Sequence, residues 1–192
     1  MPYIKSIPIR STVNRSIAYI ANKDKTDDLL YVSGLNCSAV PTIAYSEMKL
    51  VFEEYSKYKF NEAISMNEKT PIKAIHFIQS FHPNDPVTAE LAHSIAKEWA
   101  VKSFGDDRQM IVSTHLDKGH IHSHIIINTY SISGKKFNDN QTTLEAVRNL
   151  SDTVCMHYGI QPILKNENRK SHSLKYNEWD SKKKGASWKQ QI

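Results

Sequence analysis

The sequence has 192 residues, a formal net charge of +5 at pH 7, and 40% hydrophobic residues. This length can hold one domain with a substantial core. No apolar run predicts a membrane-spanning helix or a signal peptide, so we expect no membrane insertion. Cys37 and Cys155 have neither metal-site nor disulfide spacing, which predicts a reducing, cytoplasmic setting. The composition therefore excludes the disulfide-rich secreted class and the membrane-inserted class.

The positive charge is concentrated at the C-terminal end. Residues 165–192 hold eight basic residues and three acidic ones, a difference of five that equals the net charge of the whole chain. Lysines interleaved with tryptophans can neutralise phosphates while the rings stack on bases. We therefore expect a main domain at 1–164 and a basic, partly helical, DNA-binding extension at 165–192. Its expected DNA contacts are Lys175, Lys182, Lys183 and Lys184. The alternatives are a solvated tail, or tryptophans that hold the tail against the body.

Hydrophobic periodicity predicts the elements in the order β α β α β α β β α. The expected strands are 3–9, 29–35, 72–81, 108–115 and 120–130, and the expected helices are a short one near 13–21, then 43–63, 88–104 and 142–158. The last two strands are consecutive and joined by a short turn, so they must pair antiparallel. The pattern predicts an α+β fold with a central five-stranded, mostly antiparallel sheet flanked by helices.

Two hydroxyl side chains are notable for their positions. Ile17 and Ile20 lie on the apolar side of the first helix, and Tyr19 lies about 145° from the centre of that side. Tyr19 therefore points away from the core, and from its position alone an exposed ring is the simplest interpretation. Ser80 ends a strand beside the loop at 82–86, where a hydroxyl can contact phosphate, although most serines at strand ends have no such role.

The most distinctive stretch is 115–128, which holds four of the nine histidines. His120, His122 and His124 alternate with other residues ahead of three consecutive isoleucines, a pattern that indicates a strand. Second neighbours on a strand share a face and lie roughly 6–7 Å apart. Two of these imidazoles can therefore converge on one metal ion.

His115 is the nearest candidate for a third ligand. Residues 117–119 are a turn signal, so the flanking strands are expected to form a hairpin. His115 shares the histidine face only if the turn holds an even number of residues or contains a bulge. The proposed site is then His115, His122 and His124, with Asp117 as the carboxylate that orients an imidazole.

Three neutral imidazoles leave coordination positions open for a substrate oxygen, which suits a Lewis acid. Such ligands favour zinc, manganese, iron, nickel or copper over magnesium. The role of His120 stays open between a fourth ligand, a proton shuttle and a DNA contact. The other interpretations of the cluster are a structural zinc site and a chance run of histidines on a solvated face.

At this point the residues resemble a known family. His115, Asp117, His120, His122 and His124, followed by Ile-Ile-Ile-Asn, resemble the third motif of conjugative relaxases. These are the mobilization nucleases of the HUH endonuclease superfamily, and the likeness is to its tyrosine relaxases of the MOBP type. The segments 7–11 and 18–20 resemble the first motif, which carries the nucleophilic tyrosine, and 76–81 resembles the second, whose serine holds DNA near the nick. The resemblance covers roughly residues 1–165.

The resemblance implies a relaxase catalytic domain at 1–164 that nicks one DNA strand at an origin of transfer. It implies Tyr19 as the nucleophile that forms a 5′-phosphotyrosine, with Asp117, His120 or the metal assisting its deprotonation. It implies a divalent cation on the three histidines, with Mn²⁺ or Mg²⁺ in use and Zn²⁺ or Ni²⁺ as alternatives. The DNA contacts expected in the main domain are Arg10, Arg15, Ser80, Lys135 and Lys136.

The partners implied are single-stranded and hairpin DNA at the origin, an accessory DNA-binding protein and a conjugative coupling protein. The setting implied is the bacterial cytoplasm, with a plasmid or an integrative conjugative element as the mobile DNA. The chain also ends without a helix stop signal, which suggests that it was cut from a longer protein.

Two other functions compete with this one. A rolling-circle replication initiator uses the same chemistry, but many initiators carry the tyrosine on a helix after the histidine motif, whereas Tyr19 precedes it. A non-catalytic DNA-binding protein with a structural zinc is the rival from another class.

Overall fold

The structure is a computed structural model that describes residues 3–61, 68–117 and 119–160. The basic extension at 165–192, with Lys175, Lys182, Lys183 and Lys184, lies outside the described residues. Its separation from the main domain therefore stays a prediction.

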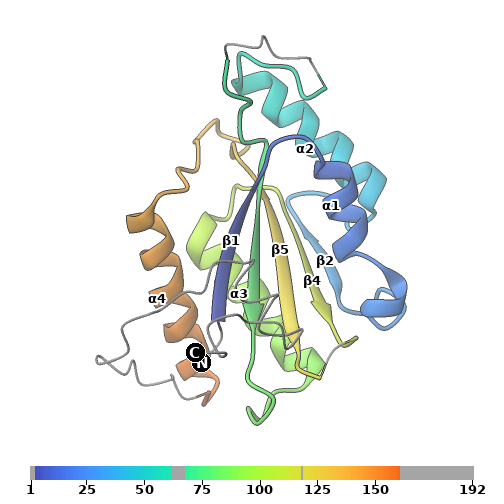
Figure 1. Ribbon diagram of the computed structural model, residues 1–192, viewed down its shortest axis with the longest axis vertical. Coiled ribbons are helices and arrows are strands. Elements are labelled where there is room, and N and C mark those ends of the chain that lie inside the picture. Colours follow the sequence, from blue (N-terminus) through green and yellow to red (C-terminus); the bar gives the residue numbers. More distant parts are fainter. Residues whose placement is uncertain (1–2, 62–67, 118, 161–192) are drawn as a thin grey trace, which may run out of the picture. The chain divides into compact units, whose positions relative to one another are not determined.

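The predicted order of strands and helices is confirmed (Figure 1). The elements are β1 (Tyr3–Ile9), α1 (Val13–Ile20), a 3₁₀ turn (Lys23–Lys25), β2 (Val32–Leu35), α2 (Pro41–Tyr55), β3 (Ala74–Ser80), α3 (Ala89–Phe104), β4 (Met110–His115), β5 (His122–Asn128) and α4 (Gln141–His157). None of these helices is both long enough and apolar enough to cross a bilayer.

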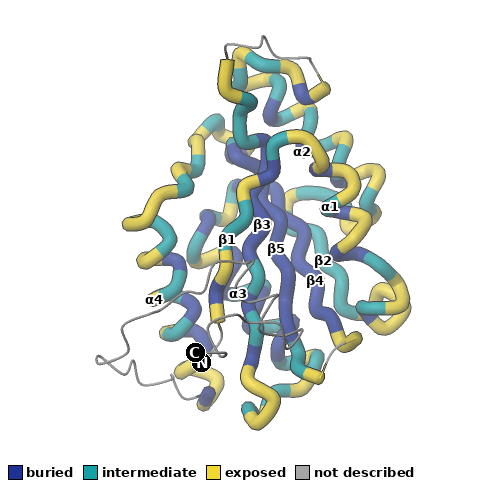
Figure 2. The backbone as a smooth tube through the Cα atoms, in the orientation of Figure 1, coloured by how far each residue is buried: buried dark blue, intermediate teal, exposed yellow. Residues whose placement is uncertain are grey.

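The five strands form one sheet in the order β1-β3-β5-β4-β2, and every neighbouring pair is antiparallel. The α+β prediction is thus confirmed, with a sheet that is antiparallel throughout the described strands. β5 is the central strand and is buried along its whole length, as Figure 2 shows for it and its neighbours.

Helices cover both faces of the sheet (Figure 1). Because side chains alternate along β5, Ile126 joins the core under α1 and α2, while Ile125 and Ile127 join the core under α3 and α4. Burial on both faces explains why three isoleucines follow one another in this strand. On the α3 side, the fully buried Trp99 donates its indole N–H to the carbonyl of Val147 in α4 at 2.9 Å.

Two predicted boundaries are wrong for local reasons. The strand expected at 29–35 begins only at Val32, because Asp27, Asp28 and Leu29 have φ values of 51°, 50° and 72° and form a turn. This left-handed backbone cannot continue a strand.

The helix expected at 43–63 begins at Pro41 and ends at Tyr55. Proline fits the first helical turn, where its missing N–H would lack a partner in any case. At Ser56 the backbone is extended, and the amide of Phe60 donates to the Glu53 carboxylate at 2.7 Å. Tyr58 and Phe60 therefore pack against the core from a loop and do not continue the helix.

Candidate active site

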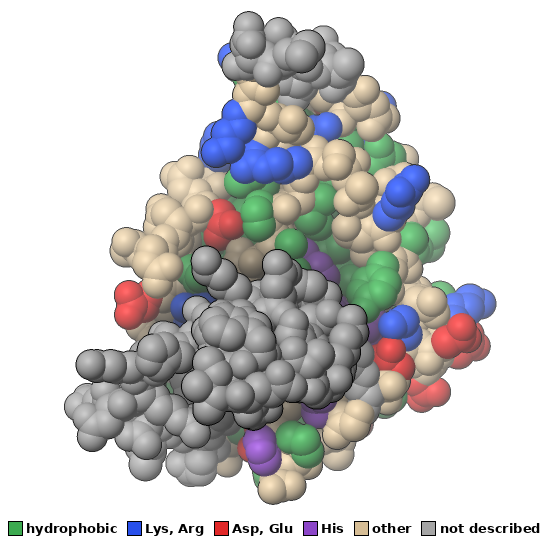
Figure 3. All heavy atoms as spheres, viewed as in Figure 1, with side chains coloured by type: hydrophobic (Ala, Val, Ile, Leu, Met, Phe, Trp, Pro, Cys, Tyr) green, Lys and Arg blue, Asp and Glu red, His purple; other side chains and the backbone are tan. Residues whose placement is uncertain are grey.

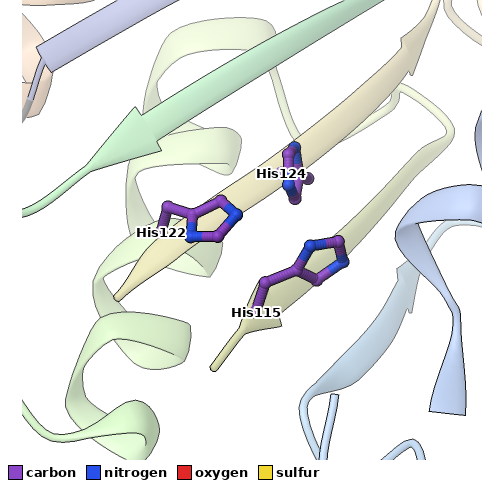
Figure 4. A group of neighbouring side chains, drawn as sticks. All are labelled: His115, His122 and His124. Atoms are coloured by element: carbon purple, nitrogen blue, oxygen red, sulfur yellow. The ribbon is translucent and has the colours of Figure 1, made fainter. Parts of the chain in front are cut away.

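The predicted register of the histidine hairpin is confirmed. His115 at the end of β4 pairs with His122 at the start of β5, and the loop between them, 116–121, holds an even number of residues. One ring nitrogen from each of His115, His122 and His124 lies within 4.8 Å of one from each of the others, and all three residues are buried. Figure 4 shows the imidazoles gathered on the same side of the two strands. In β3, Ser80 is the residue opposite His122.

Backbone carbonyls orient two of the three imidazoles. The Nε2 of His115 lies 2.9 Å from the carbonyl oxygen of Ile20, the last residue of α1. The Nδ1 of His122 lies 3.3 Å from the carbonyl oxygen of His120. A carbonyl only accepts, so these nitrogens carry the protons, and the metal-binding lone pairs of the neutral rings fall on Nδ1 of His115 and Nε2 of His122.

A fourth histidine supports the third ligand. The Nε2 of His76 in β3 lies 2.8 Å from Nδ1 of His124. Burial, with added repulsion from His115 and Lys5, lowers the pKa of His76 to about 4, so its ring is neutral. For His124 to present Nε2 to a metal, its Nδ1–H must donate to the Nε2 lone pair of His76. The sequence places His76 and Ser80 in one motif, but does not place His76 beside His124.

Tyr19 faces the histidine cluster from the end of α1. Its ring centroid lies 5.9 Å from that of His115 and 6.0 Å from that of His124, both in edge contacts. Ile17 and Ile20 are fully buried, whereas Tyr19 is 47% exposed. The prediction that Tyr19 points away from the apolar side of its helix is therefore confirmed. Because the end of α1 lies over the strands that carry the histidines, this exposed ring is next to the cluster.

Lys25 links Tyr19 to Asp117. Its ammonium nitrogen lies 4.8 Å from the centre of the Tyr19 ring and 2.8 Å from a carboxylate oxygen of Asp117. The hydrogen bond between Lys25 and Asp117 is the largest of the effects that raise the pKa of Lys25 and lower the pKa of Asp117. Two carbonyls and His76 contact the imidazoles, and the carboxylate of Asp117 pairs with Lys25. No motif in the sequence singled out Lys25.

His120 and Ser80 lie beside the cluster without joining it. The ring of His120 is centred 5.3 Å from that of His122, but His120 is not among the three clustered ligands. His120 also lines a small cavity of about 210 Å³ with Phe81 and His82. Ser80 is half-buried at the edge of the site.

The predicted basic contacts are divided between two places. Arg15 is exposed on α1, near Tyr19 in sequence. Arg10, Lys135 and Lys136 follow the ends of β1 and β5 that lie farthest along the sheet from His122, and the guanidinium of Arg10 donates to the carbonyl of Thr70. The structure therefore does not bring these three together with the histidines.

The family model and the similar proteins agree on one family. Residues 19–160 match the relaxase family described as MobA/VirD2-like, nuclease domain. The group II intron-interrupted relaxase LtrB of Lactococcus lactis subsp. cremoris is 29% identical over 193 aligned residues, covering 85% of this chain and 33% of LtrB. A protein named rlx from Staphylococcus aureus is 35% identical over 144 residues, covering 72% of this chain and 42% of that protein. The chain thus spans less than half the length of these relatives.

A solved structure shares the fold. The relaxase domain of MobM, in a Mn-bound crystal structure with plasmid pMV158 oriT DNA, superposes with a TM-score of 0.67 at 12% identity, covering 95% of this chain and 98% of that domain. At this identity the likeness concerns the fold alone. The family match covers most of the chain and includes Tyr19 and the three histidines. The chain therefore belongs to the relaxase family, as a MobA/VirD2-like nuclease domain.

Proposed function

We propose that this domain nicks one strand of DNA at an origin of transfer, with Tyr19 as the nucleophile and a divalent cation held by His115, His122 and His124. The observation that carries the proposal is the position of Tyr19, an exposed phenol whose ring lies about 6 Å from two of three clustered imidazoles. Family membership supports the same reading.

The residues present fit a divalent cation. Three ring nitrogens lie within 4.8 Å of one another. Ligands that each stand about 2 Å from one ion are about 3 to 3.4 Å apart, so the rings would close in slightly around a bound cation. The hydrogen bonds at the opposite ring nitrogens of His115 and His122 fix the tautomers that such an ion needs. When bound, the cation would neutralise charge on a non-bridging phosphate oxygen as that charge develops. Mn²⁺ or Mg²⁺ is the ion we propose, and of these two the imidazole ligands favour Mn²⁺; Zn²⁺ and Ni²⁺ are the alternatives.

The chemical step belongs to Tyr19. Its phenol gives up a proton, and the oxygen attacks the scissile phosphorus to form a phosphotyrosine on the 5′ end. The bond from phosphorus to the 3′ oxygen breaks, and that oxygen takes up a proton to become a 3′-hydroxyl. One ester bond replaces another, so rejoining the strand needs no nucleotide cofactor.

Two residues are candidates for handling the phenolic proton. Asp117 is tied to Lys25 at 2.8 Å, and this contact lowers its pKa, which makes it a weak base. We therefore assign Asp117 to holding Lys25 over Tyr19. His120 is close to His122 and belongs to the edge of the site, where it is the better candidate for a proton shuttle.

DNA would enter at the end of the sheet where β4 finishes and β5 begins. Ser80, opposite His122, would contact a phosphate near the nick, and Arg15 on α1 would hold the strand beside Tyr19. The solved MobM domain was crystallised with oriT DNA, which supports DNA at an origin of transfer as the substrate. We propose that this DNA is single-stranded and hairpin DNA. We also propose that the partners include an accessory DNA-binding protein and a coupling protein, and that the domain acts in the bacterial cytoplasm.

The test is covalent trapping. The protein is incubated with Mn²⁺ and a panel of labelled, hairpin-bearing origin oligonucleotides, and a protein–DNA band is sought on a denaturing gel. Tyr19→Phe should abolish the band. The control is Tyr3→Phe, because Tyr3 is 67% exposed and pairs with Ser80 at the same end of the sheet. An adduct that survives in Tyr19→Phe and disappears in Tyr3→Phe would overturn the assignment.

Rival tyrosines elsewhere are placed less well. The ring of Tyr31 contacts His93 of α3, and Tyr45 packs against Phe60.

Addition of EDTA separates the enzyme from a DNA-binding protein with a structural zinc. Nicking should vanish while oligonucleotide binding and the thermal unfolding temperature largely persist, whereas a protein that needs zinc to fold would unfold.

A further inference from the structure

A cavity of about 850 Å³ lies at the end of the sheet remote from the histidines. Its walls are the C-terminal end of α2, the segment that leads into β3, and the segment that follows β5. Figure 3 shows basic side chains gathered at this end of the molecule, next to apolar ones. Neither the histidine cluster nor Tyr19 contributes to the cavity.

The lining is strongly cationic. Among the described residues that line it, Arg10, Lys57, Lys69 and Lys136 carry positive charge and Asp139 alone carries negative charge. The carboxylate oxygens of Asp139 accept from the Ser6 hydroxyl at 3.1 and 3.2 Å. Such a surplus of cations is complementary to a polyanion.

Aromatic rings alternate with these cations. The ammonium of Lys57 lies 4.8 Å from the centre of the Tyr58 ring, and that of Lys136 lies 6.0 Å from the Tyr130 ring. Tyr55 is 43% exposed, and its ring lies 6.3 Å from that of Tyr130. This combination of rings and lysines matches surfaces that stack unpaired bases and neutralise their phosphates.

The chain around Tyr55 is shaped to hold its ring. The Tyr55 hydroxyl donates to the carbonyl of Ile132 at 2.8 Å. Gly134 has φ of +84°, and a Cβ at this position would lie 2.8 Å from two carbons of the Tyr55 ring. Only glycine allows the turn after β5 to close over the ring in this way. The cavity therefore has a defined aromatic wall.

We propose that this cavity is a second DNA site, which takes unpaired nucleotides of the strand that is nicked at Tyr19. The inference rests on the proposed function and adds a site to it. Bases of a paired duplex are stacked on one another and cannot stack on tyrosine, so the occupant is a single-stranded segment. Phosphates would lie against Lys57 and Lys69, and a base against Tyr58.

The sheet sets the distance between the two sites. Six residue steps along β5 separate His122 from Asn128, which corresponds to about 20 Å at about 3.4 Å per residue. A stacked strand rises about 3.4 Å per nucleotide, so about six stacked nucleotides, or fewer extended ones, connect the sites. A strand that ends closer to the nick than this should not reach the cavity.

The experiment measures binding of fluorescein-labelled oligothymidylate by anisotropy, with strands of about 20 nucleotides and of about 4. Tyr58→Ala should weaken binding of the long strand roughly 5- to 150-fold, the range for one stacked base, and Tyr58→Phe should bind like wild type. The Lys57→Ala, Lys69→Ala double variant should lower the slope of log affinity against log salt by about 1.4. The matched control, Lys97→Ala with Lys102→Ala on α3, should leave that slope unchanged.

The length dependence decides the question. The short strand cannot reach from the histidines to the cavity and occupies one site at a time, so the cavity variants should lose less affinity for it than for the long strand. Three results would overturn the second site. The first is an equal loss of affinity for the short and long strands, and the second is an unchanged salt slope in the double variant. The third is displacement of the long strand by thymidine monophosphate at equal nucleotide concentration. Adduct formation by the same variants is measured in parallel. If Tyr19 still forms the adduct while cavity variants bind normally, the second site fails and the proposed function stands. If wild type forms no adduct, the proposed function itself fails.

Discussion

Replacing His76 with phenylalanine tests how the metal site is held. Phenylalanine keeps a ring of similar size but removes the nitrogen that lies 2.8 Å from Nδ1 of His124. Residues that support a metal ligand typically contribute 10- to 100-fold in metal affinity, which is about 1.4 to 2.7 kcal/mol. Because His115 and His122 keep their carbonyl partners, we expect a loss in this range and not the abolition of binding.

Isothermal titration with Mn²⁺ measures the affinity, and the rate of nicking is followed against Mn²⁺ concentration. The rate should return to that of wild type at saturating Mn²⁺, since all three ligands remain. His76→Gln, whose amide oxygen can accept from His124, should recover part of the affinity. His93→Phe is the matched control, because His93 is also buried, with its pKa lowered to about 4, mainly by burial, but contacts Ser33 and Thr114 on the other face. Unchanged Mn²⁺ affinity in a folded His76→Phe protein would refute the reasoning.

Three further outcomes follow from the structure. Lys25→Met should slow nicking about 5- to 30-fold by removing the cation over Tyr19, with Mn²⁺ affinity unchanged in the same titration; an unaltered rate would contradict this role. The pKa of His93 is about 4 in the folded protein and 6.5 in the unfolded chain. The contribution of its buried, neutral ring to the free energy of unfolding is therefore complete above pH 6.5 and is lost as pH falls toward 4. Over that window urea denaturation should show wild type losing up to about 3 kcal/mol more than His93→Gln, and parallel curves would count against it. Phe77→Ala should lower the free energy of unfolding by about 3 to 5 kcal/mol, because its fully buried ring contacts Trp99 and Phe104; a loss below about 1 kcal/mol in urea would show that the core can collapse around the cavity.

The histidine cluster could be predicted because it depends on a short-range rule. Alternation with a period of two put His122 and His124 on one face, and an even loop carried His115 onto the same face. Both statements concern residues within a single hairpin. For the sheet the same rule covers β4 and β5, which are consecutive in sequence, whereas the other neighbouring strands of the described sheet are separated by helices or longer segments.

The partners of the cluster could not be predicted, because they depend on contacts between distant segments. His76 meets His124 only because β3 pairs with β5 in one register, and Lys25 meets Asp117 across 92 residues of sequence. Helical geometry gave the direction of Tyr19 relative to its own helix. It could not show that α1 ends above the histidines, and so an exposed ring was the simplest interpretation of that position.

On one face of the sheet the side chains change from apolar to histidine along the strands, and this change determines where the histidine site lies. β4 and β5 present Ile111 and Ile126 beneath α1 and α2, but present His115 and His124 beside the end of α1. α1 ends at Ile20, whose carbonyl accepts from His115, one residue after Tyr19. The end of one helix therefore carries the phenol and also fixes the tautomer of a ligand. Because both tasks depend on the same turn of backbone, any shift of α1 on its core would move the proposed nucleophile and loosen the proposed metal ligand together.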